Sequence, residues 1–250
     1  MRVALFVTCV NDAVYPGTGK AVVRVLERLG HEIVFPMSQT CCGQMHLNTG
    51  YRREAHKLAR AFARTFAGDD PVVVPSASCA ATVLEMYEYL ARLATDSVLE
   101  DELLSLKPRV YEFTQFLVDV LGTVDVGASF PHTVGYHPTC HSLRSLKLGD
   151  GPRRLLQAVH GLQFVELADD KSCCGFGGTF ALKNSQTSAA MGRDMVDAVT
   201  RAGVEFLCAA DNSCLTHIGG LAARSSHGFN VVHIAEVLAS TAEDPYPGAQ

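Results

Sequence analysis

The chain has 250 residues, of which 48% are hydrophobic and 19% are charged, as in an ordinary globular protein with a substantial core. Its formal net charge of −5 argues against a nucleic-acid partner, because nucleic-acid-binding proteins carry basic patches. The opening residues MRVALFVTCVND predict a strand rather than a signal peptide, and no apolar run is long enough to span a bilayer. We therefore expect a cytoplasmic protein without membrane insertion, whose nine cysteines stay reduced and serve metal or redox chemistry.

Short β-branched runs alternate with amphipathic stretches through the first half of the chain. The expected strands are residues 2–8, 31–36 and 71–75. The expected helices are a segment ending at Gly30, residues 50–67, and a segment from Cys79 to about Leu93. Residues 97–121 contain two further helical patterns, split near Lys107, which we expect to bridge two halves. This alternation predicts parallel strands joined by crossover helices.

The second half repeats the order. We expect strands at 132–137, 163–167, 204–209 and 229–233, and helices at 151–159, at 184–202, from Cys214 onward and after the last strand. The residues from Thr241 onward are expected to fray. The fold class predicted is α/β with two pseudo-equivalent halves, each a small parallel sheet flanked by helices. We place the two domains at residues 1–122 and 123–250.

Two cysteine sets of the same design are the most informative feature of the sequence. The first set is Cys9, Cys41, Cys42 and Cys79, and the second is Cys140, Cys173, Cys174 and Cys214. Corresponding members lie 131 to 135 residues apart, and each doubled cysteine is followed by a glycine. Recurrence at a near-constant offset indicates internal duplication. Each set supplies four thiolates, the number that one iron–sulfur cluster requires.

The predicted elements bring each set together. Every member follows the C-terminal end of a predicted strand, and in an open parallel sheet those ends gather on one edge, where ligands bind. Cys79 and Cys214 stand at predicted helix N-termini, where free N–H groups and the helix dipole stabilise negative sulfur. The glycines after Cys42 and Cys174 permit the sharp turn that lets neighbouring sulfurs face one centre.

Other uses of the cysteines stay open at this point. Structural zinc also accepts four thiolates, but its usual signature is a pair spaced by two to four residues, which neither half has. A thiol–disulfide enzyme needs only two cysteines per site. Burial as small hydrophobic side chains suits Cys208, inside the apolar run VEFLCAA, and fits the other eight poorly.

Several polar residues near the cysteines are secondary candidates. His137 and His217 stand three residues from a cysteine of the second set, and each could ligate or tune a cluster or simply be hydrogen-bonded nearby. His46 follows the first Cys-Cys-Gly and has the same two interpretations. Ser76 and Asp211 each precede a cysteine by three residues, and we expect them to cap a helix or bond a loop rather than bind metal. No catalytic residue is assigned.

Long stretches of the chain resemble a known family. LFVTCVND, FPMSQTCCGQ, VPSASC, TCHSLR, CCGFGGTFALK and DNSCLTHIGG, in this order, are similar to the lactate utilization protein A group of the cysteine-rich (CCG) domain family. That group is related to the cysteine-rich subunits of heterodisulfide reductases and to the iron–sulfur subunits of glycolate oxidases.

The resemblance implies a function, a cofactor and partners. It implies an iron–sulfur electron-transfer subunit of a complex that oxidises L-lactate to pyruvate, together with a companion iron–sulfur protein and a third subunit. The alternatives are a subunit that acts on a disulfide or on another 2-hydroxy acid, and a non-enzymatic metal store. In the heterodisulfide reductase relatives the last ligand region is Cys-x-x-Cys, whereas Ser76 and Asp211 hold the first of those positions here. This departure favours two four-cysteine [4Fe–4S] clusters over a five-thiolate non-cubane cluster.

Overall fold

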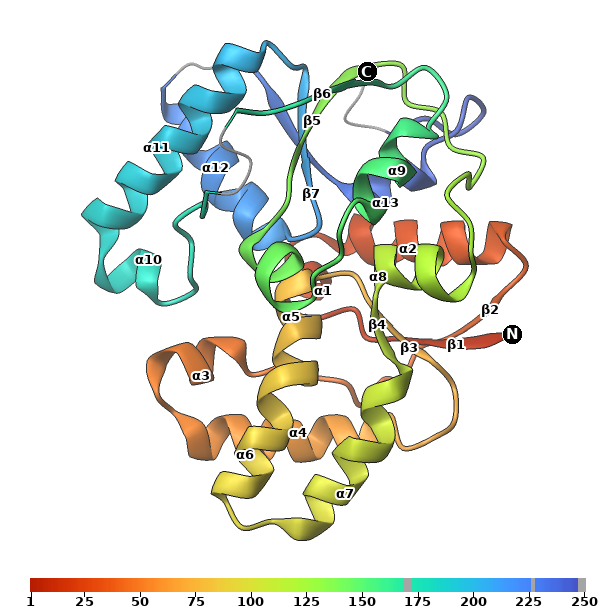
Figure 1. Cartoon of the computed structure of the whole chain (residues 1–250), viewed down its shortest axis with the longest axis vertical. Helices are drawn as coiled ribbons and strands as arrows, with labels where there is room; N and C mark the ends of the chain where they lie inside the picture. Colours follow the sequence, from red (N-terminus) through yellow and green to blue (C-terminus); the bar gives the residue numbers. More distant parts are fainter. Residues whose placement is uncertain (169–171, 226–227, 247–250) are drawn as a thin grey trace.

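The computed structural model describes residues 1–168, 172–225 and 228–246, which contain two four-stranded parallel sheets (Figure 1). The first sheet has the strand order β2-β1-β3-β4 and the second β6-β5-β7-β8. The strands are β1 (Arg2–Leu5), β2 (Glu32–Val34), β3 (Val72–Val74), β4 (Val110–Glu112), β5 (Thr133–His137), β6 (Gln163–Val165), β7 (Phe206–Ala209) and β8 (Asn230–His233). All neighbouring strands pair in parallel. The predicted α/β fold with two similar halves is confirmed.

Helices connect the strands in the same order in both halves. The first half has α1 (Cys9–Ala13), α2 (Pro16–Arg28), α3 (Gln44–Thr49), α4 (Arg52–Thr65), α5 (Ala77–Ala81), α6 (Tyr87–Leu93), α7 (Ser97–Leu106) and α8 (Phe113–Gln115). The second half has α9 (Gly151–Gln157), α10 (Phe180–Lys183), α11 (Ser185–Ala202), α12 (Asn212–Arg224) and α13 (Ile234–Ala239). Within the described residues, no helix combines the length and the apolar character needed to cross a bilayer.

Three π-helical turns and one 3-10 turn complete the helical segments. They are η1 (Thr82–Met86), η2 (Lys107–Arg109), η3 (Phe116–Val120) and η4 (His141–Ser145). The turn η1 joins α5 to α6 in one continuous helical segment. This segment is the helix that the sequence predicts from Cys79 to about Leu93, and it begins two residues earlier, at Ala77.

The sequence prediction missed one strand. Residues 97–121 do contain two helical segments split near Lys107, α7 and then α8 with η3, but between them Val110–Glu112 is the fourth strand of the first sheet, paired with β3. The chain leaves the helical path after Pro108, where the ring removes a backbone donor, and Val110 is 3% exposed against β3 and its covering helices. The predicted frayed end falls partly on residues 247–250, which lie outside the described residues.

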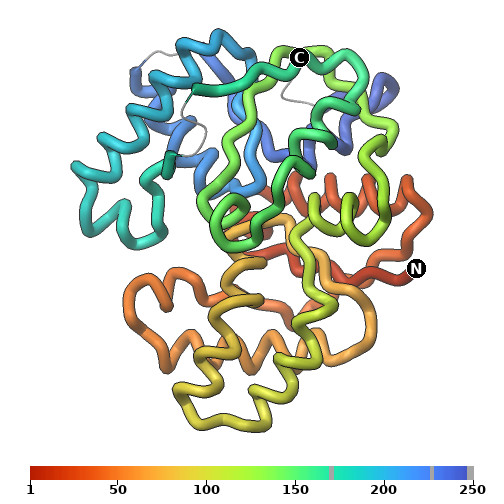
Figure 2. The backbone as a smooth tube through the Cα atoms, viewed as in Figure 1, coloured from red at the N-terminus to blue at the C-terminus, as the bar shows by residue number. Residues whose placement is uncertain are grey.

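The two halves share a common core between their sheets. One hydrophobic cluster joins β1, α2, α8 and η3 of the first half to β5, α9 and α13 of the second. A second cluster lies between the first sheet and α4, α6 and α7, and a third between the second sheet and α11 and α12. The molecule therefore stacks helices, sheet, helices, sheet and helices. In Figure 2 the N-terminal half fills the lower part of the view and the C-terminal half the upper part.

The helices of the middle layer cross between the halves. Helix α2 of the first half packs against α13 of the second, and α8 of the first half packs against α9 of the second. Since α9 follows β5 as α2 follows β1, and α13 follows β8 as α8 follows β4, these two contacts are equivalent. The crossed packing ties the two halves into one hydrophobic core.

Candidate metal centres

The structure brings together the four cysteines of the first set. Cys9 begins α1 after β1, Cys41 and Cys42 lie in the loop after β2, and Cys79 lies in α5 after β3. The Sγ atoms of Cys9 and Cys41 are 3.4 Å apart, and those of Cys42 and Cys79 are 3.1 Å apart. Cys42 and Cys79 are buried, while Cys9 and Cys41 are partly exposed. The set therefore opens to one side only.

The second set repeats this geometry. The Sγ atoms of Cys174 and Cys214 are 3.0 Å apart, and Cys140 is hydrogen-bonded to Cys173. Cys174 and Cys214 are buried, and Cys140 and Cys173 are partly exposed. All of these cysteines are free thiols. The structure thus gathers the eight cysteines chosen from the sequence into two groups of four, each at the C-terminal edge of a sheet.

The Cys-Cys-Gly turns use the conformation for which the glycines were singled out. Gly43 has φ +83° and Gly175 has φ +87°, in the left-handed region that side chains disfavour. The turn directs the Gly43 N–H to the Cys41 sulfur at 3.3 Å and the Gly175 N–H to the Cys173 sulfur at 3.4 Å. Each turn therefore places a backbone donor at the sulfur of the first cysteine of its pair.

Electrostatics separate one thiol from the others in each set. Hydrogen bonds from Cys42 and Cys9 hold the pKa of the Cys41 thiol well below its ordinary value, with a smaller contribution from His46. The hydrogen bond to Cys41 raises the pKa of Cys9, and burial adds to it. The hydrogen bonds within the set therefore favour the thiolate form at Cys41, which accepts from its neighbours.

The second set follows the same pattern. Hydrogen bonds from Cys140 and Cys174 lower the pKa of Cys173, and His137 adds to the lowering. The hydrogen bond to Cys173 raises the pKa of Cys174, and that of Cys140 is raised in the same way. Metal ligation requires deprotonated thiols, so these groups release protons when a metal binds.

The residues around the first set fit a compact, sulfur-ligated cofactor. A cavity of about 50 Å³ is lined by Cys9, Cys41, Cys42 and Cys79 together with residues from the second half, among them Phe176 and Asp211. Four soft sulfur donors suit iron–sulfur clusters and zinc, not hard cations. The donor set of each half therefore suits a metal ion or an iron–sulfur cluster held by four sulfurs.

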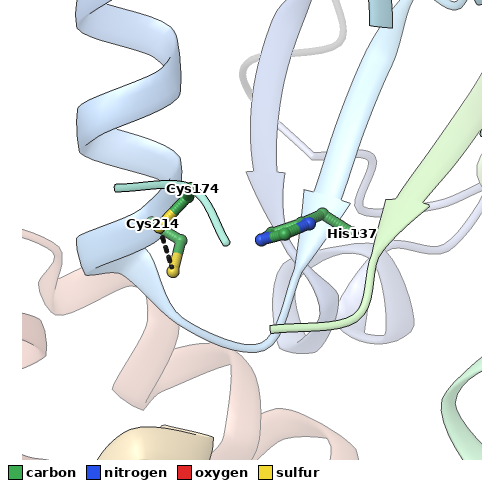
Figure 3. A group of neighbouring side chains, drawn as sticks. All are labelled: His137, Cys174 and Cys214. Carbon is green, nitrogen blue, oxygen red and sulfur yellow. Dashed lines mark hydrogen bonds between the residues drawn. The ribbon is translucent and has the colours of Figure 1, made fainter. Parts of the chain in front are cut away.

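Of the histidines selected from the sequence, His137 lies beside the second set of sulfurs and His217 points away to another helix. The buried His137, at the end of β5, forms a group with Cys174 and Cys214 whose ligand atoms all lie within 4.8 Å of one another (Figure 3). His217 instead points to Ser188 on α11, with its Nε2 3.2 Å from the Ser188 carbonyl oxygen. Cys208 belongs to the core between the sheets, whereas the buried cysteines of the two sets belong to the outer clusters.

Ser76 and Asp211 lie where the two halves meet. Ser76 caps α5, because its Oγ accepts from the Cys79 N–H at 3.2 Å. Asp211 makes no side-chain cap on its own helix. Its carboxylate instead accepts from the Ser76 hydroxyl at 2.7 Å, from the Ser78 hydroxyl at 2.8 Å and from the Thr139 hydroxyl at 3.0 Å. Asp211 also accepts from the Ser78 N–H at 3.2 Å, so it caps the helix of the other half.

A second polar contact connects the surroundings of the two sets, and sequence reasoning missed it. His141 Nδ1 lies 3.5 Å from the Cys140 sulfur, and His141 Nε2 lies 3.2 Å from Nε2 of Gln44. Gln44 follows the first Cys-Cys-Gly and lines the cavity of the first set. Nearby, the hydroxyls of Thr49 and Thr179 are 2.9 Å apart. The segments that follow the two Cys-Cys-Gly motifs therefore face each other.

Comparison with known proteins agrees with this geometry. The family model for a cysteine-rich domain, CCG, matches residues 3–83 and 134–219. The chain is 44% identical to lactate utilization protein A of Oceanobacillus iheyensis over 95% of this chain and 96% of the relative. It is 45% and 46% identical to the proteins of that name from Geobacillus thermodenitrificans and Geobacillus kaustophilus, over 95% of this chain and 98% of each relative. The chain therefore belongs to the cysteine-rich CCG family, in the group of the lactate utilization A proteins.

Proposed function

We propose that this protein is an iron–sulfur electron-transfer subunit that takes part in the oxidation of L-lactate to pyruvate. The observation that carries the proposal is the convergence of two groups of four free thiols in equivalent positions of the two halves. The names of the relatives, lactate utilization protein A, supply the substrate.

Each set of cysteines would hold one [4Fe–4S] cluster. The first site consists of Cys9, Cys41, Cys42 and Cys79, and the second of Cys140, Cys173, Cys174 and Cys214. Such clusters supply one-electron transfer at potentials set by burial and by hydrogen bonds to sulfur. The chain contributes the N–H groups of Gly43 and Gly175 as donors to ligand sulfurs. It also keeps water away from one side of each site by burying two of the four cysteines.

In this proposal, the base that takes a proton from the 2-hydroxy acid lies outside this chain. Asp211 is the only carboxylate among the described residues that line the cavity of the first set. Its oxygens already accept from three hydroxyls and one backbone N–H, which leaves it unsuited to serve as a base. We therefore assign substrate oxidation to a complex with a companion iron–sulfur protein and a third subunit. The eight free thiols of the two sets favour the reducing cytoplasm as its location.

Anaerobic purification followed by iron and sulfide counting and electron paramagnetic resonance (EPR) tests the proposal. We expect about eight irons per chain for two four-iron clusters, reducible by a one-electron donor. Cys42→Ser and Cys174→Ser should each lose one cluster and keep the other. Cys208→Ala is the matched control, because this cysteine lies in the core between the sheets. Zinc in place of iron, or an unchanged iron content in Cys42→Ser, contradicts the proposal.

A further inference from the structure

The two halves differ at the buried position three residues before the first cysteine of each set. Phe6 stands three residues before Cys9, and His137 stands three residues before Cys140. The pairing register supports this equivalence: Ala4 is opposite Val72 in the first sheet, as Gly135 is opposite Leu207 in the second. Phe6 and His137 are therefore the same position of the duplicated fold, with different chemistry.

In the first half, this position is filled by an apolar ring. Phe6 is 1% exposed and packs edge-to-face on Phe62 and Phe66, with ring centroids 5.1 Å and 5.6 Å apart. It belongs to the same hydrophobic cluster as Cys42 and Cys79. The first sulfur set therefore has a phenyl ring, which offers no hydrogen-bond donor, on this side.

In the second half, the position carries an imidazole. His137 is fully buried, and it reaches from the end of β5 toward Cys174 on the loop and Cys214 on α12 (Figure 3). One of its ring nitrogens lies within 4.8 Å of both sulfurs. A neutral imidazole carries one N–H and a protonated one carries two, so the ring can present a donor to the second set in either state.

Hydrogen bonds to ligand sulfur raise the reduction potential of an iron–sulfur cluster. They draw electron density from the thiolate and so stabilise the reduced, more negative form of the cluster. The effect is larger in a buried site, where the low dielectric strengthens polar interactions. Because four thiolates complete the ligand set of the proposed cluster, the imidazole acts through a ligand sulfur and not as a ligand of iron.

We infer that His137 donates an N–H to the buried sulfur ligands of the second centre and makes it the higher-potential of the two. Electrons then move from the first centre to the second. The two duplicated sites therefore differ in reduction potential and pass electrons in one direction. The inference rests on the proposed function, since it requires a cluster at each set. It concerns two sites with like thiolates and like backbone donors, of which the second also has His141 Nδ1 at 3.5 Å from the more exposed Cys140 sulfur.

Potentiometric titration of the full chain, followed by EPR, tests this inference one centre at a time. In the Cys42→Ser background only the second centre remains, and there His137→Phe should shift the potential downward with iron content unchanged. In the Cys174→Ser background only the first centre remains, and the same substitution should leave its potential unchanged. His137→Gln keeps an amide N–H and should restore at least part of the shift. His137→Gln also controls for any change in potential that comes from packing the larger phenyl ring of His137→Phe.

The outcomes separate the two proposals. Two clusters of equal potential in the parent chain, or an unshifted second centre in His137→Phe, overturn the role of His137 and leave the electron-transfer function standing. A chain without iron–sulfur clusters overturns both. Pulsed EPR with ¹⁵N-labelled histidine should show a weak nitrogen coupling at the second centre, removed in His137→Phe. A strong coupling of directly bound nitrogen contradicts donation through N–H.

Discussion

At the residue scale, the glycines of the two Cys-Cys-Gly turns are alike in conformation and differ in surroundings. A Cβ at Gly175 would lie 2.6 Å from the Ser188 carbonyl oxygen and 2.9 Å from the Met191 Cβ. A Cβ at Gly43 would meet only the tip of the Leu58 side chain at 3.2 Å and otherwise ordinary contacts. The turn of the second set is therefore more tightly enclosed than that of the first.

This difference predicts unequal effects of two matched substitutions. Gly43→Ala should reduce the free energy of unfolding by about 1–2 kcal/mol, the cost of placing a side chain in the left-handed region. Gly175→Ala should destabilise the protein further, because its Cβ overlaps backbone that cannot rotate away. Urea unfolding of both variants measures the difference. Equal losses of stability would show that the surroundings of Gly175 relax freely.

Residue roles within one half could be predicted from the sequence, and roles across the halves could not. The spacing of the cysteines was enough to select the two sets, and the glycine after each pair indicated a positive φ. Nothing local indicates that Asp211 would cap a helix 133 residues away by accepting from Ser78, or that His141 would meet Gln44. Such contacts depend on how the two sheets are stacked, which no periodicity encodes.

At the element scale, the last strand of each sheet ends in a buried titratable side chain that caps the next helix. Glu112, the last residue of β4, accepts from the N–H groups of Thr114 and Gln115. His233, the last residue of β8, accepts from the Ala235 N–H at 3.1 Å through its Nδ1. Burial raises the pKa of Glu112 from 4.5 to about 7 and lowers the pKa of His233 from 6.5 to about 4. Equivalent positions thus carry opposite pH responses.

Replacing one of these two capping residues should reveal how the other makes the free energy of unfolding depend on pH. Between pH 4.5 and 7 the folded state holds the Glu112 proton more tightly than the unfolded state does, so this carboxyl lowers stability as the pH rises. Between pH 4 and 6.5 the unfolded state binds the His233 proton more tightly, so this ring raises stability with pH. Each shift corresponds to about 3 kcal/mol over its window.

Glu112→Gln should therefore give a stability that rises from pH 4 to pH 6.5, and His233→Asn one that falls from pH 4.5 to pH 7. In the parent chain the two slopes largely offset each other. Urea unfolding at a series of pH values measures all three slopes, and the slope is the readout because each substitution also changes the absolute stability. Parallel curves for the parent and Glu112→Gln would contradict the assigned pKa.

The strand that sequence reasoning missed also belongs to this scale. Val110–Glu112 is three residues long, no shorter than the recognised strands β2, β3 and β6, but α8 begins directly after it with no turn to mark its end. It lies between η2 and α8, within the second of the two helical patterns that the sequence shows over residues 97–121. Its backbone pairing with β3, a contact with a distant segment, makes it a strand although the local sequence does not indicate one. The other seven strands lie within the apolar runs selected from the sequence.

At the scale of the whole molecule, Asp211 joins the halves. The buried carboxylate accepts from Ser76 and Ser78 of the first half and from Thr139 of the second. Asn212 extends the contact, because its amide donates to Asn11 and to Thr18 at 2.8 Å each. This polar joint lies at the C-terminal edges of both sheets, between the two sulfur sets.

Asp211→Asn should weaken the polar contacts between the halves while keeping the size and shape of the side chain. An amide nitrogen would replace one acceptor oxygen among four donors, and an unsatisfied buried donor costs about 1–3 kcal/mol. We expect a loss of that size in urea unfolding, with one cooperative transition for both halves because they share the middle core. Asp194→Asn, on the exposed face of α11, is the control and should change stability by less than about 0.5 kcal/mol. Equal effects of the two substitutions would contradict the role of Asp211.

The overall organisation could be predicted because the chain repeats itself. Two cysteine sets at a constant offset, each following three strand-like runs, were sufficient to predict two similar parallel sheets. The stacking of the sheets and the crossed contacts of their helices required the structure. The division into residues 1–122 and 123–250 stays a prediction, and the shared core between the sheets means that neither segment is enclosed by its own helices alone.

The crossed packing of α2 with α13 and of α8 with α9 bears on how such a chain arose. An ancestor with a single repeat would present both partners of this contact on one surface, which is the self-complementary arrangement of a twofold dimer. Fusion of two such copies would turn a concentration-dependent encounter into an intramolecular one. Once joined, the copies were free to diverge, and a position that had been identical in both protomers could become phenylalanine in one and histidine in the other.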